Sequence, residues 1–150
     1  MKFNKFLDYL GVATVSVVLI LVVLQVTMRY IFNAPLTWSE ELAVFALVWL
    51  SFVGSVICMR DHEHIEIEIL VDNLPAKIRP AVIALSRIIS AVFLAVLVYE
   101  GIEVTQMNFD TPSAANQIHM GYVYMIIPLG ALGMLYYDLK DLWNMRKGGK

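Results

Sequence analysis

The residues best suited to bind a metal ion lie in one short segment, Asp61-His62-Glu63-His64. His62 and His64 are two positions apart, so on a helix they would point to different faces, and their spacing differs from the His-Glu-x-x-His zinc motif. The single cysteine, Cys58, excludes a Cys-rich site. We therefore expect no metal site. The sequence also lacks a Gly-rich phosphate loop and a nucleophile elbow, so we expect no cofactor, no catalytic residue and no enzyme activity.

A second group of charged side chains follows the first apolar segment: Arg29, then Glu40 and Glu41. Thr37 precedes Glu40 by three positions, which is the spacing of a capping box, so we expect a helix to begin here. Two interpretations of the carboxylates stay open. Either they only cap this helix and face water, or at least one pairs with Arg29 at the membrane boundary, where a paired charge costs less than a lone one.

Apolar helices must position these groups. The chain is 59% hydrophobic and 16% charged, with a mean hydropathy of +0.70, which is more apolar surface than a soluble domain of 150 residues buries. In lipid the backbone must satisfy its own hydrogen bonds, so apolar segments of this length predict helices. We expect an all-α membrane protein in which residues 1–150 form a single four-helix transmembrane domain. Its spans are expected at roughly 9–30, 40–59, 79–103 and 119–140.

The basic residues predict the orientation of these spans. Nine of the eleven Lys and Arg residues fall in the N-terminal segment, in the loop between the second and third spans, or in the C-terminal tail. Cytoplasmic segments are enriched in Lys and Arg, so we expect both termini and this middle loop in the cytoplasm. Arg29 lies in an external loop. Arg87 lies in the third span near its cytoplasmic end, where its side chain can extend to the headgroups.

The middle loop contains Ile65-Glu66-Ile67-Glu68-Ile69, which alternates as a β-strand does. A lone strand would leave its edges unpaired, however. As a helix, the segment aligns aliphatic residues from Ile67 to Leu74 in one stripe. We therefore expect a short amphipathic helix at the cytoplasmic interface, between the second and third spans and ended by Pro75.

Small residues are frequent in the second and fourth spans, including Gly54, Gly130 and Gly133. Such residues let membrane helices approach closely. They serve either packing within the four-helix unit or docking onto another membrane subunit, and both interpretations stay open. Pro128 predicts a kink in the fourth helix.

Three blocks of sequence resemble the small membrane subunit (DctQ type) of tripartite ATP-independent periplasmic (TRAP) transporters. The blocks are Arg29-Tyr30-x-Phe32-Asn33-x-Pro35-Leu36-x-Trp38-Ser39-Glu40-Glu41-Leu42, Glu63-His64-Ile65 followed by Leu74-Pro75, and Met120-Gly121-Tyr122-Val123-Tyr124 followed by Pro128. The acidic run after Ile65 departs from the basic-then-acidic run of the family.

The resemblance implies a multi-pass protein of the bacterial inner membrane that acts as a scaffold. Its partners would be the lipid bilayer, a large membrane subunit that imports a small organic anion on a sodium gradient, and a periplasmic binding protein that captures a carboxylate such as a dicarboxylate or a sialic acid. The net charge of −2 gives no reason to expect a nucleic-acid partner. The resemblance marks the following residues as subunit-interface or structural candidates: Arg29, Asn33, Pro35, Trp38, Ser39, Glu40, Glu41, Glu63, His64, Gly121 and Pro128.

Two other functions remain as alternatives. A small four-span exporter that works as an oligomer would need an embedded carboxylate in its first span, and the apolar stretch from Tyr9 to Met28 contains none. A membrane adaptor unconnected with transport would leave the Trp38–Glu41 block without a role.

Overall fold

The computed structural model describes residues 2–34, 36–61 and 78–146. The chain forms α1 (Lys2–Tyr30), α2 (Thr37–Arg60), α4 (Arg79–Met107), α5 (Met120–Tyr124) and α6 (Ile126–Arg146). Four helical stretches are long and apolar enough to cross a membrane: Asn4–Tyr30, Thr37–Arg60, Ala81–Met107 and Met120–Trp143. The predicted all-α class with four membrane helices is therefore confirmed. The predicted amphipathic helix of the middle loop lies outside the described residues.

The fourth stretch is two helices rather than one. α5 ends at Tyr124, a turn at Met125 follows, and α6 begins at Ile126. Pro128 explains the interruption, because proline has no N–H to donate to the carbonyl four residues earlier and its ring clashes with that carbonyl. That carbonyl belongs to Tyr124, the last residue of α5. The break predicted from Pro128 is thus present, three residues before the proline itself.

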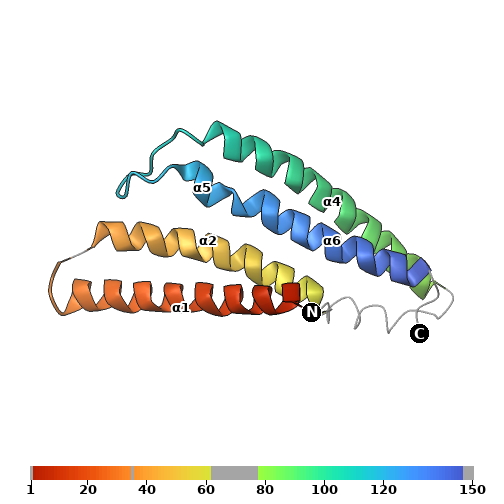
Figure 1. Ribbon diagram of the computed structural model, residues 1–150, viewed down its shortest axis with the longest axis horizontal. Helices are drawn as coiled ribbons and strands as arrows, with labels where there is room; N and C mark the ends of the chain where they lie inside the picture. The colour runs from red at the N-terminus through yellow and green to blue at the C-terminus, as the bar shows by residue number, and fades with distance from the viewer. Residues whose placement is uncertain (1, 35, 62–77, 147–150) are drawn as a thin grey trace.

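The helices lie side by side in the order α1, α2, α6, α4, with the short α5 leading into α6 (Figure 1). Among the described helices, backbone contacts join α1 only to α2, and join α4 only to α5 and α6. The structure is therefore an open layer of helices rather than a closed four-helix bundle. Among the described residues, the loop between α1 and α2 (residues 31–34 and 36) and the loop between α4 and α5 (residues 108–119) lie at the same end of this layer (Figure 1).

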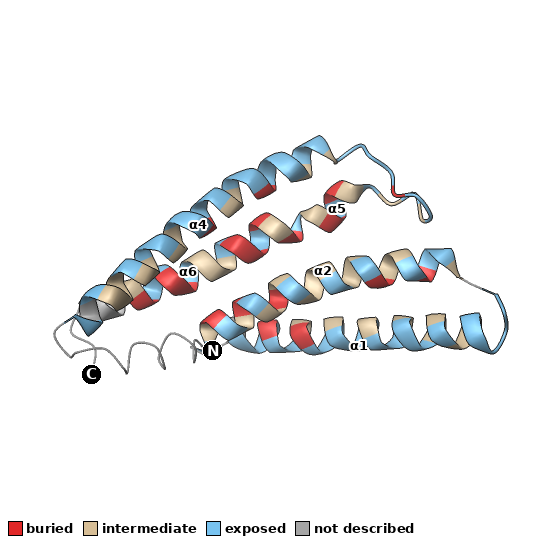
Figure 2. Cartoon of the chain, turned by 180° about the vertical axis from the view of Figure 1, so that it is seen from behind, coloured by how far each residue is buried: buried red, intermediate tan, exposed pale blue. Residues whose placement is uncertain are grey.

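Burial follows this order (Figure 2). The percentages of buried residues differ over the 18 most apolar consecutive residues of each stretch. They are 0% for α1 and 6% for α4, but 22% for α2 and 39% for the stretch containing α6. The inner helices α2 and α6 therefore hold the layer together. The outer helices present apolar surface that only lipid or another membrane protein can cover.

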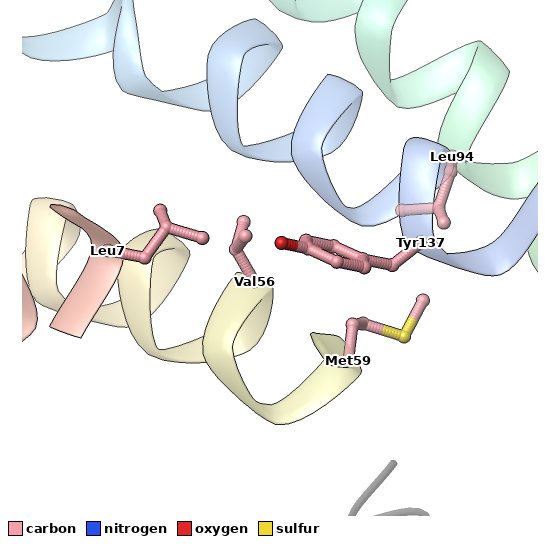
Figure 3. Packing of buried hydrophobic residues seen from close by; sticks show 5 residues of the cluster. All are labelled: Leu7, Val56, Met59, Leu94 and Tyr137. Carbon is pink, nitrogen blue, oxygen red and sulfur yellow. The ribbon is translucent and has the colours of Figure 1, made fainter. Parts of the chain in front are cut away.

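The core lies where the helices converge, at the end opposite the two loops. Leu7, Val56, Met59, Leu94 and Tyr137 form a buried cluster that draws on all four long helices (Figure 3). The clustered side chains fix the spacing of α1, α2, α4 and α6 at this end.

Glycines allow α6 to approach α2 closely. A Cβ atom at Gly130 would lie 2.9 Å from Cβ of Phe52, and one at Gly133 would lie 3.1 Å from Val56. Both glycines therefore serve packing within the chain, as one of the two sequence interpretations held. Gly54 differs, because a Cβ atom there would meet nothing within 4 Å.

Candidate functional site

The densest group of polar contacts joins Glu41, in α2, to the loop between α4 and α5, residues 108–119, which we call the second loop. The Glu41 carboxylate accepts hydrogen bonds from the Ser113 hydroxyl (3.1 Å), the backbone N–H of Ala115 (3.3 Å), and both the backbone N–H and the side-chain amide of Asn116 (each 2.8 Å). The Asn116 amide also donates to the backbone carbonyl of Trp38 at 2.9 Å. One turn of α2 thereby holds a loop more than 70 residues further along the chain.

The second loop has internal contacts that shape it for this role. The Ser113 N–H donates to the carbonyl of Ile118 (2.8 Å), and the Ile118 N–H donates to the Ser113 hydroxyl (3.1 Å). Gln117 has a φ of 56°, in the left-handed region, and lets the chain reverse between them. Ser113 is buried, so its hydroxyl links the turn of the loop to Glu41.

Gly121 sets how closely the two sides of this loop approach. Its N–H donates to the carbonyl of Asn108 at 3.0 Å. A Cβ atom at this position would lie 2.8 Å from Cα of Phe109, so any larger residue would push the backbone away. The predicted candidate Gly121 therefore belongs to the same loop end as Trp38 and Glu41.

The start of α2 is built differently from the capping box expected there. α2 does begin at Thr37, but its N-cap is Leu36, in an extended conformation and without a side-chain capping bond. Ser39 is fully buried, and its hydroxyl donates to the Leu36 carbonyl at 2.9 Å. The helix start predicted here is therefore confirmed, but the capping box of Thr37 and Glu40 is wrong, because the N-cap is Leu36 and no side chain makes a capping hydrogen bond.

Arg29 forms no ion pair with Glu40 or Glu41 among the described residues, so the pairing interpretation is also wrong. The Glu41 carboxylate is occupied by the second loop. The guanidinium of Arg29 lies 5.9 Å from the centre of the Tyr30 ring. Arg29 and Glu40 instead face a common cavity of about 580 Å³, whose lining consists of Gln25, Arg29, Tyr30, Asn33, Leu36 and Glu40. We call it the Arg29–Glu40 cavity.

Two further polar contacts join neighbouring helices away from the loops. At the opposite end of α2, Arg60 binds Asp8 of α1 at 2.6 Å and donates to the backbone carbonyl of Asn4 at 2.9 Å. Between α4 and α6, Arg87 donates to Asp138 at 3.0 Å and lies 3.3 Å from Asp141. The Arg87 side chain therefore pairs with carboxylates of α6 within the layer.

The structure brings together most of the predicted site residues that it describes. Trp38, Glu41 and Gly121 contact the second loop, Ser39 lies between the first two in α2, and Arg29, Asn33 and Glu40 line a cavity. Pro128 lies apart, where α6 crosses Gly101 of α4. The candidates outside the described residues are Pro35, Glu63 and His64.

Sequence reasoning missed the partners Ser113, Asn116 and Asp138. For Asp138 a signal existed. Arg87 lies eight residues after the first residue of α4, and Asp138 lies eight before the last residue of α6, so the two antiparallel helices place them at one depth. Ser113 and Asn116 sit in a loop with no such register, and their types alone do not indicate a partner.

The described ranges contain no group of three or more His, Cys, Asp or Glu residues that could hold a metal ion. Most of the Asp61–His64 segment lies outside those ranges. The polar groups that bind the second loop to α2 are the Glu41 carboxylate with amide and hydroxyl donors, a set suited to fixing a loop.

Comparison with known proteins identifies a family. A family model of the DctQ component of tripartite ATP-independent periplasmic transporters matches residues 18–148. The chain is 30% identical over 107 residues to a Haemophilus influenzae protein named as a TRAP transporter small permease protein, a match that covers 71% of this chain and 64% of that one. It is 24% identical over 144 residues to the sialic acid TRAP transporter small permease protein SiaQ of Vibrio cholerae, covering 96% and 83%.

A longer protein matches over nearly the whole chain. The sialic acid TRAP transporter permease protein SiaT of Haemophilus influenzae is 26% identical over 147 residues, which are 98% of this chain but 24% of that protein. In that relative, the counterpart of this chain is therefore one part of a much larger permease polypeptide.

Proposed function

We propose, from the premise that this chain belongs to the family of DctQ components of TRAP transporters, that it is the small subunit of such a transporter and docks onto a large membrane subunit. The observation that carries the proposal is the open layer of helices. α1 and α4 bury almost nothing within the chain, although each is a full membrane helix. A layer whose outer helices are uncovered is suited to extending a larger membrane domain. The relative SiaT supports this, because the part that matches this chain is only 24% of that permease.

The same premise supports the finer parts of the proposal. The large subunit would import a small organic anion on a sodium gradient, and a periplasmic protein would deliver it. The named relatives include transporters of sialic acid and of C4-dicarboxylates, so a carboxylate is the class we propose. This chain would supply a scaffold rather than the transport site, act as a single four-helix domain, and have no enzymatic role.

We also propose that the chain lies in the inner membrane with both termini in the cytoplasm. The two loops at one end of the layer contain no Lys or Arg, and Arg29, in the last turn of α1, is the one such residue beside them. The opposite end carries Arg60, Arg79 and Arg146. This asymmetry supports placing the loop end in the periplasm.

In this orientation Glu41 would present the two periplasmic loops as one rigid surface. Its four hydrogen bonds tie the second loop to the first turns of α2. We propose that this surface, including Trp38 and Gly121, organises assembly with the other subunits.

Co-purification tests the docking proposal. The full chain is expressed with an affinity tag together with a large membrane subunit of a TRAP transporter from the same organism, and the detergent-solubilised complex is isolated. We expect a stable complex of the two proteins in equal amounts. Quantitative loss of the large subunit during mild purification, with both proteins folded, would contradict the proposal.

A further inference from the structure

The Arg29–Glu40 cavity contains two opposite charges that do not meet. Within the described residues, neither the Arg29 guanidinium nor the Glu40 carboxylate forms a hydrogen bond or an ion pair with another side chain. Both nevertheless line the same hollow of about 580 Å³, together with the residues Gln25 and Asn33. The volume lies within the range of small-ligand sites. A cation and an anion that line one cavity without forming an ion pair are complementary to a zwitterion.

The cavity lies at the level where a membrane span ends. Arg29 is in the last turn of α1 and Glu40 is in the first turn of α2, and the apolar stretches of these helices end at Tyr30 and begin at Thr37. Lipid phosphates and amines occupy this level of a bilayer.

Exposed apolar residues adjoin the cavity lining along the chain, and we call them its rim. Tyr30 lines the cavity and is 75% exposed, Ile31 (72%) and Phe32 (63%) lie between the lining residues Tyr30 and Asn33, and Trp38 follows the lining residue Leu36. Aromatic and aliphatic side chains at a helix end rest in the membrane interface, so this rim favours a lipid over a ligand dissolved in water.

We propose that the Arg29–Glu40 cavity binds the headgroup of a zwitterionic phospholipid that carries a primary ammonium. The guanidinium of Arg29 binds the phosphate, because guanidinium groups present paired N–H donors to phosphate oxygens. The carboxylate of Glu40 accepts from the ammonium. Both charges are then satisfied, and the acyl chains remain in the bilayer.

Native mass spectrometry of the full chain tests this with four probes: phosphatidylethanolamine, phosphatidylcholine, phosphatidylglycerol and soluble phosphoethanolamine. Only phosphatidylethanolamine can donate a charge-assisted hydrogen bond to Glu40, so we expect it to bind at least about tenfold more tightly than the other two lipids. Phosphatidylcholine has no N–H to donate, and phosphatidylglycerol has no cation. Soluble phosphoethanolamine is expected to bind far more weakly than the lipid.

Variants assign the selectivity to the two charges. Glu40→Gln should abolish the preference for phosphatidylethanolamine, and Arg29→Gln should weaken all three lipids. The matched control is Glu103→Gln, an exposed carboxylate on α4 at the other edge of the layer, which should bind as wild type does.

Three results would overturn the proposal. The first is equal binding of the three lipids by the wild-type chain, which needs no variant to fold. The second is a preference that survives Glu40→Gln, and the third is soluble phosphoethanolamine binding as tightly as the lipid. If Arg29→Gln and Glu40→Gln leave lipid binding unchanged but reduce co-purification with the large subunit, the cavity belongs to a protein contact instead.

Discussion

Glu41 shows how one residue can fix a loop that is distant in sequence. Its carboxylate has two oxygens, and all four hydrogen bonds to residues 113–116 use them. The neighbouring Glu40, in an adjacent position on the same helix, points to the cavity beside Arg29. The sequence pattern Trp-Ser-Glu-Glu identified this turn as important but did not distinguish the roles of its two carboxylates, because their partners lie on different segments.

Replacing Glu41 with Gln should free the second loop. The amide keeps one acceptor oxygen and converts the other to a donor, so it cannot accept from Ala115, Asn116 and Ser113 together. We expect faster amide hydrogen exchange at residues 113–118 and a thermal midpoint lowered by several degrees. Glu103→Gln serves as the matched control. If residues 113–118 of the Glu41→Gln variant exchanged their amide hydrogens at the wild-type rate, the Glu41 carboxylate would not be what holds the second loop.

The Arg87–Asp138 pair should behave as a buried ion pair. The side chain of Asp138 is 1% exposed and that of Arg87 20% exposed. Removing one partner of such a pair costs roughly 3–5 kcal/mol, because the other charge stays buried and unpaired, whereas replacing both with apolar residues is often nearly neutral.

We therefore expect Arg87→Leu and Asp138→Leu to lower the free energy of unfolding by about that amount each, and the double variant to be more stable than the two losses predict. Denaturant unfolding in detergent gives the free energy of unfolding for the wild type, the two single variants and the double variant. Losses that simply add would show that Arg87 and Asp138 do not interact.

At the scale of the helices, the sequence predicted the four membrane spans and their helical type, but not all of the helix ends or the division of the fourth span into α5 and α6. Uninterrupted apolar stretches identified the spans because lipid tolerates few charges. α1 begins at Lys2, seven residues before the span expected from residue 9. The ion pair between Asp8 and Arg60 allows the helix to extend beyond the apolar region with its charge neutralised. The interruption before α6 followed from Pro128 alone.

Close packing of α2 against α6 gives a prediction at this scale. Gly130→Ala would place a methyl group 2.9 Å from Cβ of Phe52, which is too close for either helix to keep its position. We expect a loss of roughly 1–3 kcal/mol in the free energy of unfolding. Gly54→Ala is the control, because a Cβ atom there meets nothing within 4 Å. A thermal midpoint for Gly130→Ala equal to that of the control would contradict the close approach.

The order of the helices in space could not be read from the sequence. An apolar stretch predicts that a helix spans the membrane. It does not predict which helix lies beside it, because lipid and the surface of a neighbouring helix are equally apolar. The placement of α6 between α2 and α4 depends on particular residues, among them Gly130 against Phe52 and Arg87 beside Asp138. The outer positions of α1 and α4 then follow from their lack of buried surface.

The orientation of the whole molecule is open to a direct test. Reporter fusions after Lys150 and within residues 72–77 should report the cytoplasm, and fusions near Pro112 the periplasm, because the basic residues gather at the end of the layer away from the loops. A periplasmic reporter after Lys150 would contradict the proposed orientation.

Transport by purified components tests the central claim most directly. The chain is reconstituted into liposomes alone, and in parallel as the complex with its large subunit and the periplasmic binding protein, and uptake of the organic acid bound by that protein is followed under an inward sodium gradient. The scaffold role predicts sodium-dependent uptake by the complete system and none by the chain alone. Uptake by this chain in isolation would contradict that role and favour a small exporter-like transporter instead.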